Sequence, residues 1–254
     1  MSGEKEIKAI VRKRYSAVAL HAGHKCCIGT PELEKLLTKG YSAEELETLP
    51  ESVIAMSKGC GNPTALGMIN KDDTVLDLGS GGGLDVFLAS RKVGSKGKVI
   101  GLDMTPEMIQ QSVENVKRIG VANVEFKLGE IEQIPLDNES IDAIMSNCVI
   151  CLSPDKRRVF GEMFRVLRPG GRLAIADELA LTPFSEEEKL DPIKWSTCIT
   201  GAITEQEYTN MLEEAGFKDT YVKRLRERRN EEGASLGVVS AFISATKPMN
   251  DKAD

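Results

Sequence analysis

Histidine is scarce in this chain, which has two residues of this type, His21 and His24, among 254. Both lie near the start of the sequence, away from its glycine-rich and cysteine-bearing motifs. Because histidine is the most common general base in enzymes, a reaction that depends on a histidine base is not favoured. Internal repeats and low-complexity segments are absent too, so no repeat architecture is expected.

Long apolar runs are also missing. No stretch approaches the roughly 20 apolar residues of a membrane-spanning helix, and charges interrupt residues 4–20, so we expect neither a signal peptide nor contact with a membrane. The formal net charge of −6 argues against a general nucleic-acid binder. The basic run at residues 223–229 is interpreted as a solvated strand end and turn. The sequence thus predicts a cytoplasmic protein.

The length and the 41% hydrophobic content are enough for one core, and a second independent domain is not expected. We predict a helical, cysteine-bearing extension over residues 1–35, one domain over residues 36–248, and a disordered tail over residues 249–254. Apolar residues recur at helical spacing in the extension. This pattern predicts an amphipathic helix over residues 4–20 that lies across the domain.

A glycine-rich sequence, Asp77-Leu78-Gly79-Ser80-Gly81-Gly82-Gly83, follows the apolar run 74–76, and Asp103 closes the next apolar run, 24 residues after Gly79. A buried strand, a crowded turn, a helix and a second strand that ends in an acid form half of a nucleotide-binding unit, and the acid is placed to bind ribose hydroxyls. A dinucleotide site would need a third small residue where this chain has Leu84. The alternation of Asp77, Gly79, Gly81 and Gly83 instead resembles motif I of class I S-adenosylmethionine methyltransferases. The resemblance implies S-adenosylmethionine as the cofactor.

The remaining sequence continues the alternation of strands and helices. Strands are predicted at residues 124–128 and 141–146, and residues 166–176 read as a helix end, a Pro-Gly-Gly turn and a fifth strand. A loop-rich stretch follows Asp177, then a helix near residues 204–215 and two β-rich runs at 217–225 and 236–245. We therefore predict an α/β fold with a doubly wound, mostly parallel, Rossmann-like seven-stranded sheet and ligands at the carboxyl ends of its strands. The predicted cofactor-binding residues are Asp77, Gly79, Ser80, Gly81, Asp103, Met104, Gly129, Glu130, Ile131 and Asn147.

Cysteine is the unusual residue of this chain. A disulfide framework is not expected in a reducing compartment, and a buried cysteine commonly acts as a small hydrophobic residue. Cys60, Cys148 and Cys198 have more distinctive surroundings: a Gly-flanked turn before the first strand, the carboxyl end of the fourth strand, and the loop region after the fifth. The six cysteines are Cys26, Cys27, Cys60, Cys148, Cys151 and Cys198.

These cysteine contexts resemble those of the arsenite S-adenosylmethionine methyltransferases, a likeness that runs from residue 41 to residue 245. The resemblance implies that Cys60, Cys148 and Cys198 hold trivalent arsenic, and that Cys26 or Cys27 can pair with Cys60. Cys151 stands where the family usually has Asn, so no role is implied for it. The segments that carry the match are Gly59-Cys60-Gly61-Asn62-Pro63, residues 78–85, Gly101-Leu102-Asp103-Met104-Thr105, Ser146-Asn147-Cys148-Val149-Ile150, residues 152–156 and Cys198-Ile199-Thr200-Gly201-Ala202.

The implied chemistry is consistent with the residues present. Arsenic(III) is a soft centre that prefers thiolate ligands, and three sulfurs leave it a lone pair that acts as the nucleophile without a general base. Inorganic arsenite needs three thiols, here Cys60, Cys148 and Cys198, whereas a monomethylated arsenical needs only Cys148 and Cys198. Two protein thiols then reduce the product by forming a disulfide, which an external thiol of the glutathione kind or thioredoxin reopens. The predicted partners are arsenite, methylated arsenicals and this reductant, and we expect a monomer.

Three other functions are compatible with parts of the sequence. A methyltransferase of a small organic acceptor such as a quinone or sterol would use the sheet but not the cysteines. A zinc-binding protein would use His21, His24, Cys26 and Cys27 with Cys148 and Cys151, although this spacing does not match paired zinc knuckles. A metalloid-binding sensor without catalysis would use the same thiols. Turnover of S-adenosylmethionine with arsenite distinguishes these alternatives.

Overall fold

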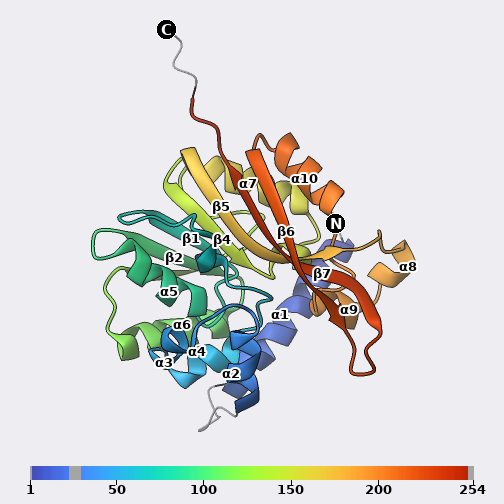
Figure 1. The fold of residues 1–254 in the computed structure, drawn as a ribbon, viewed down its shortest axis with the longest axis horizontal. Helices are drawn as coiled ribbons and strands as arrows, with labels where there is room; N and C mark the ends of the chain where they lie inside the picture. The colour runs from blue at the N-terminus through green and yellow to red at the C-terminus, as the bar shows by residue number, and fades with distance from the viewer. Residues whose placement is uncertain (1, 23–29, 251–254) are drawn as a thin grey trace.

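A computed structural model describes residues 2–22 and 30–250 of the chain. At its centre lies a seven-stranded sheet with the strand order β3-β2-β1-β4-β5-β7-β6, in which β7 is antiparallel to both neighbours and the other strands are parallel (Figure 1). This arrangement confirms the predicted fold class. The strands are β1 (Thr74–Leu78), β2 (Lys98–Asp103), β3 (Val124–Leu128), β4 (Ile141–Asn147), β5 (Leu167–Ala180), β6 (Lys218–Arg229) and β7 (Ser235–Thr246).

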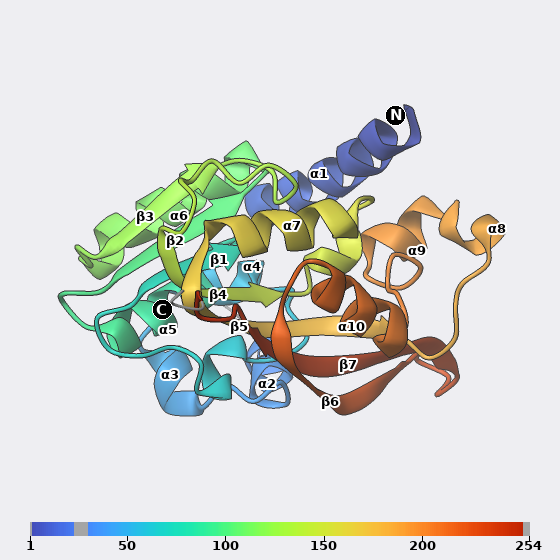
Figure 2. The same cartoon turned by 90° about the horizontal axis from the view of Figure 1, so that it is seen from above.

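Apolar side chains leave the central strands on both faces, because successive residues of a strand point to opposite sides. Val75 packs with α5 on one face, and its neighbour Leu76 packs with α7 and α10 on the other. Helices α2, α3 and α4 add a further apolar layer against α5 (Figure 2). The helices are α1 (Ser2–Ala22), α2 (Thr30–Leu37), α3 (Ala43–Glu47), α4 (Glu51–Met56), α5 (Leu84–Val93), α6 (Pro106–Ile119), α7 (Lys156–Val166), α8 (Glu186–Lys189), α9 (Pro192–Ser196) and α10 (Glu205–Glu214), with short 3-10 helices η1 (Pro63–Leu66) and η2 (Ile150–Leu152).

The predicted amphipathic helix is present as α1. It contacts α4, α6 and α9, and so runs across the domain (Figures 1 and 2). Val11 and Ala19 are buried on its inner side, whereas Leu20 is exposed. No helix of the described residues combines the length and apolar character of a membrane span. Cys26, Cys27 and His24, and residues 251–254 of the predicted tail, lie outside the described residues.

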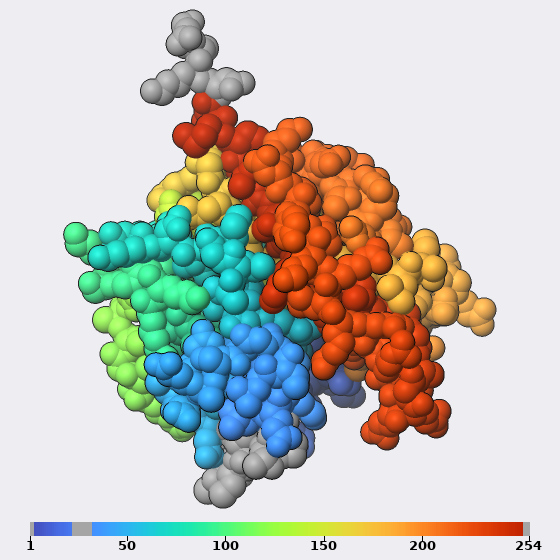
Figure 3. Space-filling model, viewed as in Figure 1, coloured from blue at the N-terminus to red at the C-terminus, as the bar shows by residue number. Residues whose placement is uncertain are grey.

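The structure corrects two local predictions. The Pro-Gly-Gly segment is part of β5, where the pairing with β4 is irregular. Gly170 N donates to Lys247 O, and Lys247 N donates to Gly171 O. The basic run 223–229 lies within β6, and the hairpin turn follows it and stands away from the body (Figure 3). The residues of that run are therefore held in a ladder with β7, where their side chains have fixed directions.

Candidate active site

The glycine-rich loop turns sharply at the carboxyl end of β1. Gly79 has φ +68°, and a Cβ placed on it would lie 2.1 Å from a methyl carbon of Val149, so only glycine fits there. The amides of Gly79 and Ser80 donate to the carbonyl of Leu102 at 2.8 and 3.0 Å, which ties the loop to β2. The loop therefore leaves a cavity between the ends of β1 and β2.

Asp103 is fixed at the edge of this cavity. One carboxylate oxygen accepts from Gly81 N at 3.0 Å and the other accepts from Thr105 N at 2.8 Å. Burial raises the pKa of Asp103, while these two amide contacts act in the opposite direction. The acid predicted from the spacing thus lines the cavity, with both carboxylate oxygens held by backbone amides.

The lining of this first cavity is acidic. Burial, followed by the charges of Asp85 and Asp103, raises the pKa of Asp77 well above its ordinary value. Burial raises the pKa of Asp85 to about 6, against hydrogen bonds from Asn147 and Tyr41 that lower it. Glu132 also lines the cavity. This cluster of carboxyl groups favours a ligand with positive charge.

Most of the predicted cofactor-binding residues line this cavity together. Glu130 does not: it accepts from Lys8 Nζ at 2.7 Å and faces Arg12 at 3.4 Å, and its neighbour Glu132 faces the cavity instead. The hydroxyl of Ser80 is buried against Gly101 of β2 and has no hydrogen-bond partner among the described residues. The predicted residues that do line the cavity are Asp77, Gly79, Ser80, Gly81, Asp103, Met104, Gly129, Ile131 and Asn147.

Asn147, the last residue of β4, holds the Cys60 turn in place. Its side-chain oxygen accepts from Cys60 N at 2.9 Å and from Gly61 N at 3.4 Å. Its side-chain nitrogen donates to Gly61 O at 2.7 Å and to an Asp85 carboxylate oxygen at 2.9 Å. One amide therefore joins the thiol-bearing turn to the wall of the first cavity.

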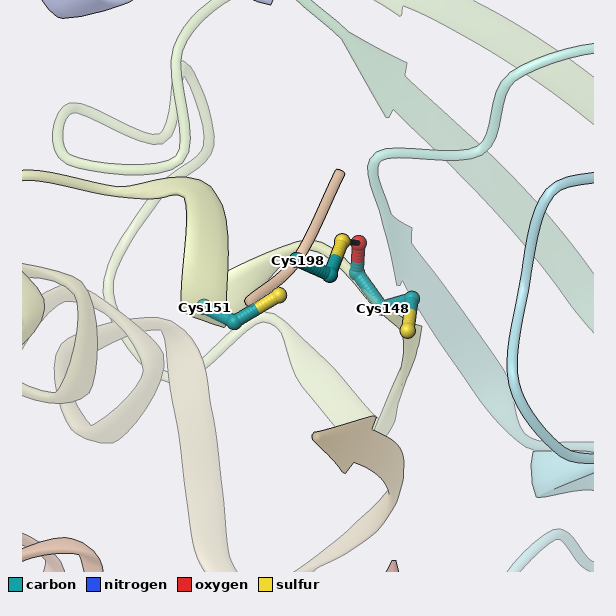
Figure 4. A group of neighbouring side chains, drawn as sticks. All are labelled: Cys148, Cys151 and Cys198. Carbon is teal, nitrogen blue, oxygen red and sulfur yellow. Dashed lines mark hydrogen bonds between the residues drawn. The ribbon is translucent and has the colours of Figure 1, made fainter. Parts of the chain in front are cut away.

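Four thiols gather beyond this cavity, in two groups that share Cys148. Figure 4 shows one of these groups, Cys148, Cys151 and Cys198. The sulfurs of Cys148, Cys151 and Cys198 lie within 4.8 Å of one another, and so do the sulfurs of Cys60 and Cys148 with a carboxylate oxygen of Glu178. Among the described residues, neither group joins Cys60 to Cys198. The structure thus brings two of the three predicted arsenic ligands together directly and adds Cys151.

Cys148 and Cys198 both have φ of +60°. This left-handed conformation is uncommon in residues with a side chain, and such residues cluster at functional sites. The amide of Cys148 nevertheless donates to Ala176 O at 2.8 Å, so the backbone of Cys148 is held against β5 at the carboxyl end of β4. The Cys198 thiol donates to Cys148 O at 3.5 Å, which places the two segments side by side (Figure 4).

The pKa of each of the four described thiols is raised above its ordinary value. The Cys151 and Cys198 thiols lower the pKa of Cys148, whereas the Cys60 thiol and burial raise it, and the resulting pKa is about 12. Burial raises the pKa of Cys151 well above its ordinary value. The cysteines of the described residues are free thiols.

A second cavity opens on these thiols. Cys60, Cys148, Cys198 and Glu178 line it, and Cys148 also lines the first cavity. Tyr15 of α1 likewise borders both spaces. Five basic side chains also line this second cavity, and we call them the basic rim. They come from α1, from the α2–α3 connection, from β6 and from the segment that follows α4: Arg14, Lys39, Lys58, Arg226 and Arg228.

Comparison with known proteins identifies the family. Residues 69–216 match the family described as "Methyltransferase domain". A protein of Halobacterium salinarum named arsenite methyltransferase is 39% identical over 97% of this chain and 68% of its own length. The human arsenite methyltransferase is 35% identical over 68% of this chain and 48% of its own length. This chain belongs to the arsenite methyltransferase family. It spans about half the length of the human relative.

A solved structure from this family has the same fold. The arsenic(III) S-adenosylmethionine methyltransferase of Chlamydomonas reinhardtii aligns with a TM-score of 0.65 and 28% identity, covering 89% of this chain and 76% of the algal chain. Membership in the arsenite methyltransferase family agrees with the pairing of an acidic cavity and a thiol-lined cavity. S-adenosylmethionine is the cofactor of this family.

The sequence analysis did not predict two acidic residues that lie beside the thiols of this arsenite methyltransferase family member. Asp177 follows the last residue of β5 that pairs with β4 and accepts from Cys151 N at 3.1 Å, and burial raises its pKa to about 7. Glu178 accepts from the Ser240 hydroxyl at 3.1 Å and lies 3.8 Å from Arg228, and burial raises its pKa to about 7 as well. Two consecutive acids at the carboxyl end of a buried strand were a visible signal for both residues.

Proposed function

We propose that this chain transfers methyl groups from S-adenosylmethionine to thiol-bound trivalent arsenic, first arsenite and then methylarsenite, and so contributes to arsenic detoxification. The observation that carries this proposal is the position of Cys148. Its thiol belongs to a cluster of soft ligands, and the same residue lines the acidic cavity next to it. A methyl donor in one cavity and arsenic in the other would meet at this residue.

The acidic cavity suits the cofactor in charge and shape. S-adenosylmethionine supplies, when bound, an electrophilic methyl group on a positively charged sulfur. Asp103 would accept hydrogen bonds from the ribose, and the carboxyl groups of Asp77 and Asp85 would favour the cationic end. Met104 and Ile131 would enclose the adenine with apolar surface. Glu132, rather than Glu130, offers the carboxylate of this segment to the cavity.

Arsenite binding requires no charged thiolates beforehand. Each arsenic–sulfur bond forms as an arsenic–oxygen bond breaks, and the thiol proton leaves with the hydroxide as water. This exchange is neutral overall, so buried thiols with raised pKa values, such as Cys148 and Cys198, are suitable ligands. Cys148 and Cys198 serve both arsenite and methylarsenite.

Methyl transfer then depends on alignment. The arsenic lone pair forms the bond to the methyl carbon, and no proton has to be removed, so this step needs no histidine, and none of the described residues that line the two cavities is one. Orientation alone can contribute up to ~7–11 kcal/mol in well-arranged sites. The anchored backbones of Cys148 and Cys198 provide such fixed positions.

Reduction after transfer falls to the thiols that border the second cavity. Arsenic recovers its electron pair when two protein thiolates leave as a disulfide, which an external thiol must reopen. Cys60 lies beside Cys148 and is suited to this exchange. Cys26 or Cys27 stays the predicted partner of Cys60. The basic rim favours an anionic thiol of the glutathione kind over a neutral one, and a reducing compartment such as the cytoplasm fits the free cysteines.

The decisive experiment measures S-adenosylhomocysteine with and without arsenite at a fixed concentration of thiol reductant. We expect product only with arsenite, and a Cys148→Ser variant should form none. Product with a quinone or sterol and none with arsenite would support the organic-acceptor alternative. Arsenite binding without product would indicate a sensor, and zinc retained after purification without arsenite binding would indicate a zinc protein.

A further inference from the structure

Cys151 lies in the thiol cluster although the family resemblance gives it no role. It is 1% exposed and follows Cys148 by three residues, in the 3-10 helix η2 that leaves the end of β4. Its sulfur lies within 4.8 Å of those of Cys148 and Cys198 (Figure 4). Cys60, the thiol that the sequence suggested as the third ligand, shares such a group with Cys148 and Glu178 instead.

Several contacts fix Cys151 in this position. Its amide donates to Asp177 at 3.1 Å, and its carbonyl accepts from Lys156 Nζ at 3.3 Å. A Cβ on Gly201 would lie 2.3 Å from that carbonyl oxygen, so the segment that bears Cys198 packs directly on the Cys151 backbone. The cluster is therefore assembled from two segments that are held against each other.

We infer that Cys148, Cys151 and Cys198 form a three-sulfur site for inorganic arsenite, in which Cys151 is the third ligand. The inference rests on the proposed function. Three arsenic–sulfur bonds form, three arsenic–oxygen bonds break, and the three thiol protons leave in three molecules of water. Cys151 borders neither cavity, whereas Cys148 borders both. Cys151 would thus bind arsenic from the buried side, opposite the face that is open to the methyl donor's cavity.

The ligand set suits trivalent arsenic better than zinc. A structural zinc site takes four ligands from cysteine, histidine or carboxylate, and this cluster offers three such groups among the described residues. Trivalent arsenic takes three sulfurs and keeps a lone pair. A monomethylated arsenical can take two sulfurs, so Cys148 and Cys198 suffice for it. Cys151 would therefore distinguish the first methylation from the second.

Arsenite binding can be followed without turnover, because Trp195 is the single tryptophan of the chain and packs in the same apolar cluster as the three cysteines. Titrations of its fluorescence use an anaerobic protein with a phosphine reductant, which contributes no sulfur. Cys151→Ala and Cys151→Ser should weaken arsenite binding by at least the roughly 10–100-fold lost when an outer-shell partner of a metal ligand is removed. Both should bind methylarsenite within about twofold of the wild type, a change of less than 1 kcal/mol.

Cys60→Ser discriminates between the two candidate third ligands, because Cys60 lines the second cavity but lies outside the three-sulfur group. X-ray absorption at arsenic should count three sulfur neighbours in the wild type and in Cys60→Ser, and two in the Cys151 variants. The inference is overturned if Cys60→Ser loses a sulfur neighbour, or if Cys151→Ala keeps three. If the Cys151 variants fail to fold, loss of a sulfur neighbour in Cys60→Ser still overturns the inference. Arsenic held by three sulfurs without S-adenosylhomocysteine formation would refute the proposed function and leave this assignment intact.

Discussion

The side-chain oxygen of Asn147 accepts a hydrogen bond from the amide of Cys60 at 2.9 Å, across 87 residues of sequence. The nitrogen of the same side chain donates to Asp85 at 2.9 Å. Asn147 therefore connects a thiol-bearing turn to a carboxyl group that lines the cofactor cavity. These two contacts require a side chain that accepts one hydrogen bond and donates another, and among side chains of this length only that of asparagine does both.

Asn147→Asp tests this connection with almost no change in shape. The new oxygen would face Asp85 where a donor stood, so the variant should be destabilised by about 1–3 kcal/mol. The loss should be larger at pH 8 than at pH 5, because Asp85 has a pKa of about 6 and is ionised only at the higher pH. Urea unfolding at the two pH values provides the measurement, and equal losses at both would contradict the proposed contact.

Asp103→Ala should weaken S-adenosylmethionine binding by roughly 1.5–3 kcal/mol, the value of hydrogen bonds to a charged group. Because Asp103 also accepts from Gly81 N and Thr105 N, part of any effect could come from the loop itself. Asp103→Asn is the matched variant, as it keeps one acceptor oxygen and should lose less. Calorimetric titration gives the cofactor affinity, and Trp195 fluorescence checks that arsenite binding is unchanged. Unaltered cofactor affinity would remove Asp103 from the site.

Much of the fold follows from local signals in the sequence. Apolar runs that end in Asp77 and Asp103 predict both the strands and the cavity between them, because parallel strands place their carboxyl ends at one edge. The prediction of a turn at the Pro-Gly-Gly segment was wrong. Gly170 forms a hydrogen bond with Lys247, which follows β7 and is about 77 residues away, and the residue types of a local turn do not indicate such a distant partner.

The thiol cluster shows the same limit. Cys148 could be placed from its strand, but the proximity of Cys151 to Cys198 depends on how the segment after β5 folds back on η2. Likewise, most of the basic run of β6 is exposed, as the sequence predicted, but Arg228 donates to the carbonyl of Thr197 at 2.9 Å and borders the thiol cavity. Such contacts form between segments that are distant in the sequence, so no periodic pattern of residues predicts them.

Asp85→Asn should change the pH dependence of stability. Burial raises the pKa of Asp85 to about 6, so between about pH 4 and pH 6 the folded protein holds a proton that the unfolded chain has released. The wild type therefore loses stability as the pH rises through this window. From pH 4 to pH 7 the stability of Asp85→Asn should improve relative to the wild type by on the order of 2–3 kcal/mol. Urea midpoints across this range test the sign, and a constant difference between the two proteins would refute it.

Cys148→Ser and Cys198→Ser should each abolish methylation of both arsenite and methylarsenite, because a hydroxyl is too hard a ligand to hold the metalloid. Initial rates of S-adenosylhomocysteine formation with each substrate provide the measurement. Both variants should bind S-adenosylmethionine normally, which separates loss of arsenic from loss of fold. Near-normal turnover of Cys148→Ser would eliminate this residue as an arsenic ligand.

Cys60→Ser separates binding from reduction. If Cys60 were a permanent ligand for inorganic arsenite, this variant would lose the first methylation and keep the second. With Cys151 as the third ligand, we expect Cys60→Ser to bind arsenite and complete one turnover at close to the wild-type rate. Repeated turnover should then slow at limiting external thiol, because the thiol beside Cys148 that closes a disulfide is missing. Rapid-quench measurement of the first turnover, compared with the steady state at low and high thiol, decides between the two roles: a first turnover on arsenite that is lost while methylarsenite still reacts would make Cys60 the ligand.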